Sequence, residues 1–105
     1  MEIVFSSGAL EEVEEAEEAV KYYEDEVKGL GKAFLQKLYE AIREIKSFPS
    51  SSRIIRADYR RYLLHRFSFG VIYLIDNGFI FVAAVMHLKR KPFYWTKREK
   101  RMKAK

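Results

Sequence analysis

The chain has 105 residues, a formal net charge of +5 and no cysteine. This length predicts one domain over residues 1–105, with one hydrophobic core and no room for a second. The lack of cysteine excludes a disulfide framework and a thiolate metal site, and the first residues lack the basic start and cleavage site of a signal peptide, so we expect a cytoplasmic protein.

Charge is distributed unevenly along the chain. Residues 1–27 hold ten acids and one base, whereas residues 53–105 hold fourteen bases and three acids. This asymmetry indicates a basic working surface in the second half, facing a polyanion or an acidic partner. The alternative is a solvated surface rich in Glu and Lys, and we favour it for the acidic first helix. A basic C-terminal tail is expected from about residue 97.

The first half predicts a short strand and two helices. Residues 2–6 are β-prone, and Ser7 can cap a helix that starts near residue 8 and ends at Lys28-Gly29. A second helix follows residue 31 and ends before Pro49, and the short connection predicts an antiparallel hairpin. The apolar stripes are Leu10, Val13, Ala16, Val20, Tyr23 and Val27 in the first helix, and Phe34, Leu35, Leu38, Ile42 and Ile45 in the second.

The second half predicts strands over residues 53–56 and 61–67, followed by a long apolar stretch over residues 67–88. Only Asp76-Asn77-Gly78 interrupts this stretch. A membrane span of this length would carry Asp76 near its centre, at a cost of about 2.5 to 3.5 kcal/mol. Asn-Gly between β-rich segments is instead a preferred two-residue hairpin turn, because both central positions need positive φ. We therefore predict two long antiparallel strands and no membrane span.

The predicted order is βααββββ, an α+β fold in which the N-terminal strand joins a small, mainly antiparallel twisted sheet and the helical hairpin packs on one face. The opposite face is expected to be concave, partly exposed and lined mostly with Arg. Alternation over residues 61–67 places Arg61, Leu63, His65 and Phe67 on one face and Tyr62, Leu64 and Arg66 on the other, with a bend at residues 68–70 that can reset the parity.

Short motifs follow one another along nearly the whole chain. They are Tyr22-Tyr23-Glu24, Gly29-Leu30-Gly31 with Phe34, Phe48-Pro49, Arg60-Arg61-Tyr62-Leu63-Leu64, Arg66-Phe67, Val71 with Tyr73, and the ending His87, Arg90, Pro92 and Tyr94-Trp95. Together with the βααββββ order, these motifs resemble the RelE/ParE superfamily of type II toxin-antitoxin toxins. The resemblance is strongest to plasmid-stabilisation, or ParE-like, sequences.

The resemblance implies one of two activities. RelE-like members are ribosome-dependent mRNA endonucleases, whereas ParE-like members are associated with inhibition of DNA gyrase and need no nuclease site. Both imply a cognate antitoxin that wraps an extended segment over the toxin, and an acidic antitoxin would suit an Arg-rich toxin. The implied partners are thus this antitoxin and either the ribosome with mRNA or DNA gyrase.

Candidate catalytic residues follow from the needs of metal-independent RNA cleavage, which requires a base, an acid and cations around one phosphate. His87 titrates nearest neutrality, and Arg61 and Arg90 can clamp phosphate. Tyr94 with His87 resembles the Tyr and His pairing of YoeB-like members. The alternative for His87 is a structural role, and His65 is a weaker candidate. The predicted catalytic set is His87, Arg90, Tyr94 and Arg61.

Candidate RNA- or antitoxin-binding residues are Arg60, Arg66, Lys89, Lys91, Trp95 and Arg98. The alternative to a binding role is, for the arginines, that they only line a solvated sheet face. For the Tyr94-Trp95 pair, the alternative is that it only caps the core. No residues have the spacing of metal ligands or of a cofactor motif, so we expect neither a metal nor an organic cofactor.

We expect a toxin that inhibits translation by ribosome-dependent mRNA cleavage, because His87, Arg90 and Tyr94 lie on one short segment after a strand. Two departures from the nuclease pattern keep alternatives open. Residues 71–75 contain no base, and Leu88 stands where the resemblance implies an Arg. The alternatives are a ParE-like gyrase inhibitor without nuclease activity and a non-toxic relict of the fold.

Overall fold

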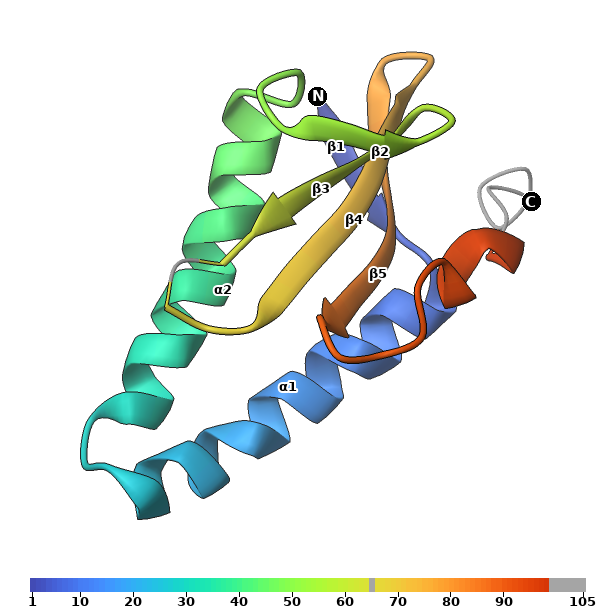
Figure 1. The fold of residues 1–105 in the computed structure, drawn as a ribbon. Coiled ribbons are helices and arrows are strands. Elements are labelled where there is room, and N and C mark those ends of the chain that lie inside the picture. Colours follow the sequence, from blue (N-terminus) through green and yellow to red (C-terminus); the bar gives the residue numbers. More distant parts are fainter. Residues whose placement is uncertain (65, 99–105) are drawn as a thin grey trace.

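The computed structural model describes residues 1–64 and 66–98. In chain order these form β1 (Glu2–Phe5), α1 (Ser7–Glu26), α2 (Leu30–Ser47), β2 (Arg53–Arg56), β3 (Tyr59–Leu63), β4 (Phe69–Asp76), β5 (Phe79–His87) and the short 3-10 helix η1 (Tyr94–Lys97) (Figure 1). The predicted βααββββ order is confirmed. His65 and most of the predicted basic tail lie outside the described residues.

The sheet has five strands in the order β1-β5-β4-β3-β2. β1 runs parallel to β5, and the other neighbouring pairs are antiparallel. Figure 1 shows α1 and α2 as a hairpin on one face of the sheet, with α1 running beside β5. This arrangement confirms the α+β fold expected from the sequence. None of the helices in the described ranges is long and apolar enough to cross a membrane.

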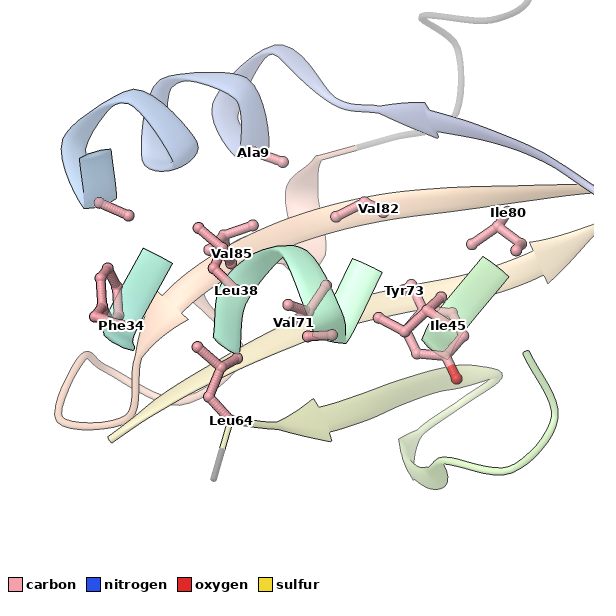
Figure 2. Close-up of a cluster of buried hydrophobic side chains, with 12 residues drawn as sticks. Ala9, Phe34, Leu38, Ile45, Leu64, Val71, Tyr73, Ile80, Val82 and Val85 are labelled. Atoms are coloured by element: carbon pink, nitrogen blue, oxygen red, sulfur yellow. The ribbon is translucent and has the colours of Figure 1, made fainter. Parts of the chain in front are cut away.

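The main core lies between the helical hairpin and the sheet (Figure 2). Its members are small or branched side chains of α1, large apolar side chains of α2, and alternate residues of β4 and β5. Burial of this kind contributes about 25 cal/mol per Å² of apolar surface and is the main force holding the helices on the sheet. The buried residues are Ala9, Ala16, Phe34, Leu38, Ala41, Ile45, Leu64, Val71, Tyr73, Ile80, Val82 and Val85.

α1 is turned relative to its predicted orientation. Ser6 rather than Ser7 caps the helix, because its side-chain oxygen accepts a hydrogen bond from Ala9 N at 3.0 Å. Ala9 is fully buried, whereas Leu10 is 51% and Val27 59% exposed. The predicted apolar stripe is therefore wrong at both of its ends.

The connection between α1 and α2 depends on two glycines. Gly29 has a φ of +87°, and a Cβ on Gly31 would lie 2.3 Å from the carbonyl oxygen of Val20. The carboxylate of Glu24 accepts hydrogen bonds from Gly29 N at 2.7 Å and Gly31 N at 3.1 Å. The bond from Gly29 is the main reason why the pKa of Glu24 is lowered. Glu24 thereby stabilises the positive N-terminal end of α2.

The β4–β5 hairpin turns as the sequence predicts. Asn77 has a φ of +47° and Gly78 a φ of +83°. Both central residues of the turn are thus left-handed, which matches the right-handed twist of the flanking strands. This local prediction is confirmed at each residue.

A bulge in β5 changes which side chains face the helices. Ile72 pairs with Ala84 and Tyr73 with Val82, so Ala83 is an extra residue in β5. Val82 lies in the helix-side core, whereas Ala83 and Ala84 both lie in a cluster on the opposite face. The bulge lies next to the part of β5 that extends beyond its pairing with β1, and the functional site is built there.

The sheet face opposite the helices is partly exposed, but an apolar cluster covers more of it than the predicted lining of Arg side chains. A second cluster covers its β4–β5 half, and Trp95 of η1 is 1% exposed within it. The β2–β3 half keeps exposed side chains, among them Arg53 and Arg61. The buried members of this second cluster are Ile72, Leu74, Phe81, Ala83, Ala84, Met86 and Trp95.

β3 is shorter than predicted and its parity changes after the strand. It ends at Leu63, and Arg66 adopts a φ of +75° in the following turn. Phe67 then packs on the helix side, with its ring centroid 5.1 Å from that of Phe34. Arg61 is paired with Ile72, a member of the opposite-face cluster. The predicted common face for Arg61 and Phe67 is therefore wrong, and the reset occurs in the turn.

Candidate functional site

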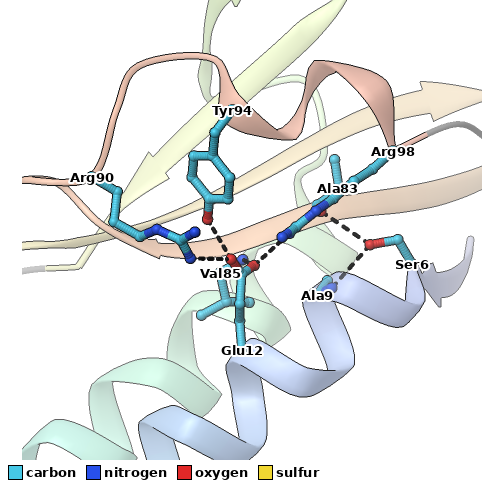
Figure 3. A network of polar contacts seen from close by, with 8 residues as sticks. All are labelled: Ser6, Ala9, Glu12, Ala83, Val85, Arg90, Tyr94 and Arg98. Carbon is cyan, nitrogen blue, oxygen red and sulfur yellow. Dashed lines mark hydrogen bonds and ion pairs between the residues drawn. The ribbon is translucent and has the colours of Figure 1, made fainter.

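One buried carboxylate gathers most of the polar contacts of the C-terminal segment (Figure 3). Glu12 of α1 is 5% exposed. It accepts hydrogen bonds from Val85 N at 2.9 Å, from Arg90 at 2.9 Å and from Arg98 at 2.7 Å. The hydroxyl of Tyr94 donates a further, short hydrogen bond to it. We call Glu12, Arg90, Tyr94 and Arg98 the Glu12 cluster.

The Glu12 cluster occupies a strand edge that would otherwise be unsatisfied. β1 pairs with β5 only as far as Val82. Beyond that point, Ala83 O accepts from the hydroxyl of Ser6 at 3.0 Å and from Arg98 at 3.1 Å, while Val85 N donates to Glu12. Side chains of α1 and of the C-terminal segment thus replace a neighbouring strand along this edge.

Electrostatics in the Glu12 cluster favour a protonated Tyr94. Partial burial first, and the hydrogen bond to Glu12 second, raise the pKa of Tyr94 well above its usual value. The guanidinium of Arg90 lies 3.8 Å from the centre of the Tyr94 ring, and that of Arg98 lies 5.0 Å from it. Tyr94 therefore acts as a hydrogen-bond donor at neutral pH, and the carboxylate offsets one of the two Arg charges.

His87 lies on the helix side, at the end of β5. Its Nδ1 accepts a hydrogen bond from Lys89 N at 3.1 Å, and its ring meets Phe69 edge to face at 5.1 Å. His87 and Arg90 line one pocket of about 180 Å³, which we call the β5 pocket; its lining residues are Glu12, Glu15, Ala16, Phe69, Val85, His87 and Arg90.

Arg61 belongs to a different place on the molecule. It lines a cleft of about 90 Å³ on the sheet face opposite the helices, which we call the Arg61 cleft. The structure therefore brings three predicted catalytic residues, His87, Arg90 and Tyr94, to the end of β5 but does not bring Arg61 to them. The cleft is lined by Ile55, Arg61, Ile72, Met86, Pro92, Phe93 and Trp95.

Two of the predicted binding residues have structural contacts. Arg60 donates hydrogen bonds to the carbonyl oxygens of Ser50 at 3.0 Å and Ser52 at 2.7 Å. These bonds hold the segment before β2 against β3. Trp95 is buried, and its ring lies 4.7 Å from that of Tyr59. Trp95 thus caps the second cluster in this structure, which matches the alternative given for it, and its role in binding stays a prediction.

The other predicted binding residues are more accessible. Lys89 and Lys91 are exposed on the loop after β5, and Arg66 is exposed in the turn after β3. Arg98 is engaged in the Glu12 cluster with 24% of its side chain exposed. The turn with Arg66 and the loop with Lys89 lie at the same end of the sheet, because Phe69 pairs with His87 and Leu88 N donates to Ser68 O at 2.8 Å. Among the described residues, no group of three or more His, Asp or Glu could hold a metal ion.

Sequence reasoning missed Glu12, which it assigned to a solvated acidic surface. The available signal was its spacing. Glu12 follows Ala9 by three residues and precedes Ala16 by four, so all three lie on one face of α1. Starting the stripe at Ala9 rather than Leu10 would have placed one glutamate among the buried positions.

Comparison with known proteins identifies the fold. No protein-family model matches the chain, and no curated protein matches it by sequence. Among solved structures, a chain described as "Chromosomal ParDE TA system from P. aeruginosa" superposes with a TM-score of 0.64 at 13% sequence identity, over 85% of this chain and 97% of that one. The chain therefore has the ParE-like α+β fold that its resemblance to the RelE/ParE superfamily implied.

Proposed function

We propose that this chain is the toxin of a type II toxin-antitoxin system and that it arrests growth by binding its target, without cutting RNA. The ParE-like fold and the sequence motifs support the toxin assignment. The single observation that supports binding over cleavage is the Glu12 cluster. It commits Arg90, Tyr94 and Arg98 to a carboxylate of the same chain.

RNA cleavage makes demands that the described residues meet poorly. Phosphate clamping needs cations whose charge is available, yet Glu12 lies 2.9 Å from Arg90 and 2.7 Å from Arg98. A phenol that donates to a carboxylate is a poor base, and the raised pKa of Tyr94 makes it a poor acid at neutral pH. Arg61, the remaining predicted clamp, lines the cleft on the other sheet face.

The proposed target is DNA gyrase, as the ParE-like resemblance implies, and the proposed partner is a cognate antitoxin. Both would be met in the cytoplasm. An excess of basic residues in the second half of the chain supports an acidic antitoxin, because complementary charge accelerates association.

A second candidate remains a ribosome-dependent endoribonuclease. The observation that favours it is the β5 pocket, in which His87 and Arg90 stand together with two carboxylates, Glu12 and Glu15. An imidazole beside a guanidinium could serve as general base next to a bound phosphate. This candidate requires Arg90 to exchange Glu12 for the substrate.

The two candidates separate in one experiment. The chain is induced in a bacterial host, and incorporation of labelled thymidine and labelled methionine is followed over the first minutes. We expect thymidine incorporation to fall first, and His87→Ala to remain as toxic as the unchanged chain. If methionine incorporation falls first and His87→Ala abolishes toxicity, the ribonuclease candidate replaces our proposal. Unimpaired growth would assign the chain to the non-toxic relicts of the fold.

A further inference from the structure

The Arg61 cleft combines an apolar floor with a basic rim. Its lining consists of apolar and aromatic side chains and one guanidinium, and it contains no carboxylate. Its lining residue Phe93 is 37% exposed, and Leu63 on the same sheet face is 51% exposed. Grouped exposed apolar side chains on a small protein commonly mark an interaction site.

Two arginines face each other across β2 and β3 without compensation, and one of them, Arg61, lines the cleft. Arg53 on β2 and Arg61 on β3 are directly opposite in the strand register, so their side chains lie on the same face. Like charges in this position destabilise a sheet. Neither side chain has a hydrogen-bond or ion-pair partner within residues 1–64 and 66–98. A bound carboxylate between them would remove this repulsion.

The position of Arg61 depends on Gly70, which lies diagonally across from it on β4. Leu63 pairs with Gly70, and a Cβ on Gly70 would lie 3.3 Å from Cγ of Arg61 and 3.4 Å from a side-chain carbon of Leu88. The aliphatic stem of Arg61 thus lies over the space that Gly70 leaves empty. From this position Arg61 lines the cleft.

We propose that the Arg61 cleft binds one branched aliphatic side chain of an acidic peptide segment, whose flanking carboxylates bridge Arg53 and Arg61. The segment belongs to the neutralising partner, so its source rests on the proposed function. A small apolar cavity gains from an aliphatic group, and paired arginines recognise carboxylates through charge-assisted hydrogen bonds.

A nucleobase fits the cleft less well than an aliphatic side chain. A cavity of about 150 Å³ accommodates benzene, and this cleft measures about 90 Å³. Stacking surfaces are also occupied. The guanidinium of Arg56 lies 4.5 Å from the centre of the Phe93 ring, and Trp95 is covered by Tyr59 and Phe93. The geometry therefore favours a peptide over single-stranded nucleic acid.

The chain carries its own reporters for this site. Met86 lines the cleft, and the two other methionines are Met1 in the exposed first position and Met102, which lies outside the described residues. Trp95, which also lines the cleft, is the only tryptophan. Methionine-methyl NMR and tryptophan fluorescence on the full chain thus observe the cleft directly.

The experiment titrates three synthetic peptides into the protein: acetyl-Glu-Leu-Glu-amide, acetyl-Lys-Leu-Lys-amide and acetyl-Glu-Gly-Glu-amide. We expect only the first to shift the Met86 methyl signal and the Trp95 emission at millimolar concentration, with Met1 unchanged. Arg61→Ala should weaken this binding roughly tenfold, because a charge-assisted hydrogen bond is lost. Arg43→Ala removes an exposed guanidinium from α2, on the other side of the sheet, and should leave the binding unchanged.

Three outcomes would overturn the proposal: no Met86 shift with the acidic leucine peptide, an equal shift with the lysine peptide, or equal binding by Arg61→Ala. A Met86 shift produced by a uridine oligonucleotide and by none of the peptides would assign the cleft to nucleic acid instead. Toxicity is measured separately by induction. If the chain binds the peptide but does not arrest growth, the peptide site stands and the proposed function is wrong. If the chain arrests growth but does not bind the peptide, the proposed function stands and the peptide site is wrong.

Discussion

Glu12 and Arg98 are 86 positions apart in the sequence, and their side chains meet at 2.7 Å in a site where Glu12 is almost fully buried. The contact joins the first turns of α1 to the end of η1 across the free edge of β5 (Figure 3). A buried carboxylate is stable only when it is paired and hydrogen-bonded, and Glu12 has both kinds of partner. Glu12 therefore fixes the position of the C-terminal segment.

We expect Glu12→Ala to lower the free energy of unfolding by about 3 kcal/mol, because it leaves Val85 N and the partly buried Arg98 without their acceptor. Loss of the ion pair with the half-exposed Arg90 contributes less to this change, since water screens that pair. Urea denaturation measures the change. Glu14→Ala removes an exposed glutamate from the same helix and should change stability by less than about 0.5 kcal/mol. Equal midpoints for the two variants would contradict this role.

Tyr94 should make stability fall at alkaline pH. Its pKa is raised in the folded protein above its ordinary value of about 10, chiefly by burial and then by Glu12. Above that pH the unfolded chain releases the Tyr94 proton while the folded chain keeps it, so rising pH favours unfolding. Below it, the contribution is fully present.

The measurement is the urea midpoint of the unchanged chain and of Tyr94→Phe between about pH 9 and 11. We expect a steeper fall for the unchanged chain. Tyr23→Phe is the matched control, since Tyr23 is a half-buried tyrosine that packs on Phe34, outside the Glu12 cluster. Parallel curves for the unchanged chain and Tyr94→Phe would show that Tyr94 carries no such linkage.

Gly31→Ala should destabilise the helical hairpin by about 1 to 3 kcal/mol, because the new Cβ would lie 2.3 Å from a backbone oxygen of α1, which cannot move independently. The thermal unfolding midpoint reports the loss. Lys32→Ala, at the next and exposed position, is the control and should have little effect. A stabilised Gly31→Ala would mean that the helices can separate at no cost.

Trp95→Ala should lower the free energy of unfolding by about 3 to 5 kcal/mol, the usual range for removing a large buried aromatic side chain. Phe93→Ala, two residues earlier and 37% exposed, should cost much less. Denaturation of both variants distinguishes a core role for Trp95 from a role in base stacking. A Trp95→Ala protein with unchanged stability would return Trp95 to the candidate binding residues.

The sequence predicts the parts of this fold that depend on neighbouring residues. Asn77-Gly78 forms the expected turn because the preference for positive φ belongs to those two residues alone. The range of β2 is confirmed. α1 ends at Glu26, before the predicted Lys28-Gly29, and the left-handed Gly29 lies at the start of α2 instead. The helix cap was misplaced by one residue because Ser6 and Ser7 offer the same hydroxyl, and the hydrogen bond from Ser6 to Ala83 decides between them.

The candidate site was harder to predict because its contacts are distant in the sequence. Glu12 is paired in its buried position by contacts with Arg90, Tyr94 and Arg98. No local sequence pattern predicts these long-range contacts. The bulge at Ala83 has no local signature either, yet it decides which side chains of β5 face the helices. Arg61 was grouped with His87 by residue type, and strand pairing places them on opposite faces.

The parallel pairing of β1 with β5 has a consequence for synthesis on the ribosome. Glu2 pairs with Phe79 and Phe5 with Val82, so the first strand made has no sheet partner until most of the chain has emerged. Contacts between such distant segments are slow to form, because the loop between them must close first. Until then Glu12 remains hydrated and η1 cannot dock. An interrupted translation product would therefore lack the sheet's completed edge, and the folded surface would exist only on chains synthesised through residue 98.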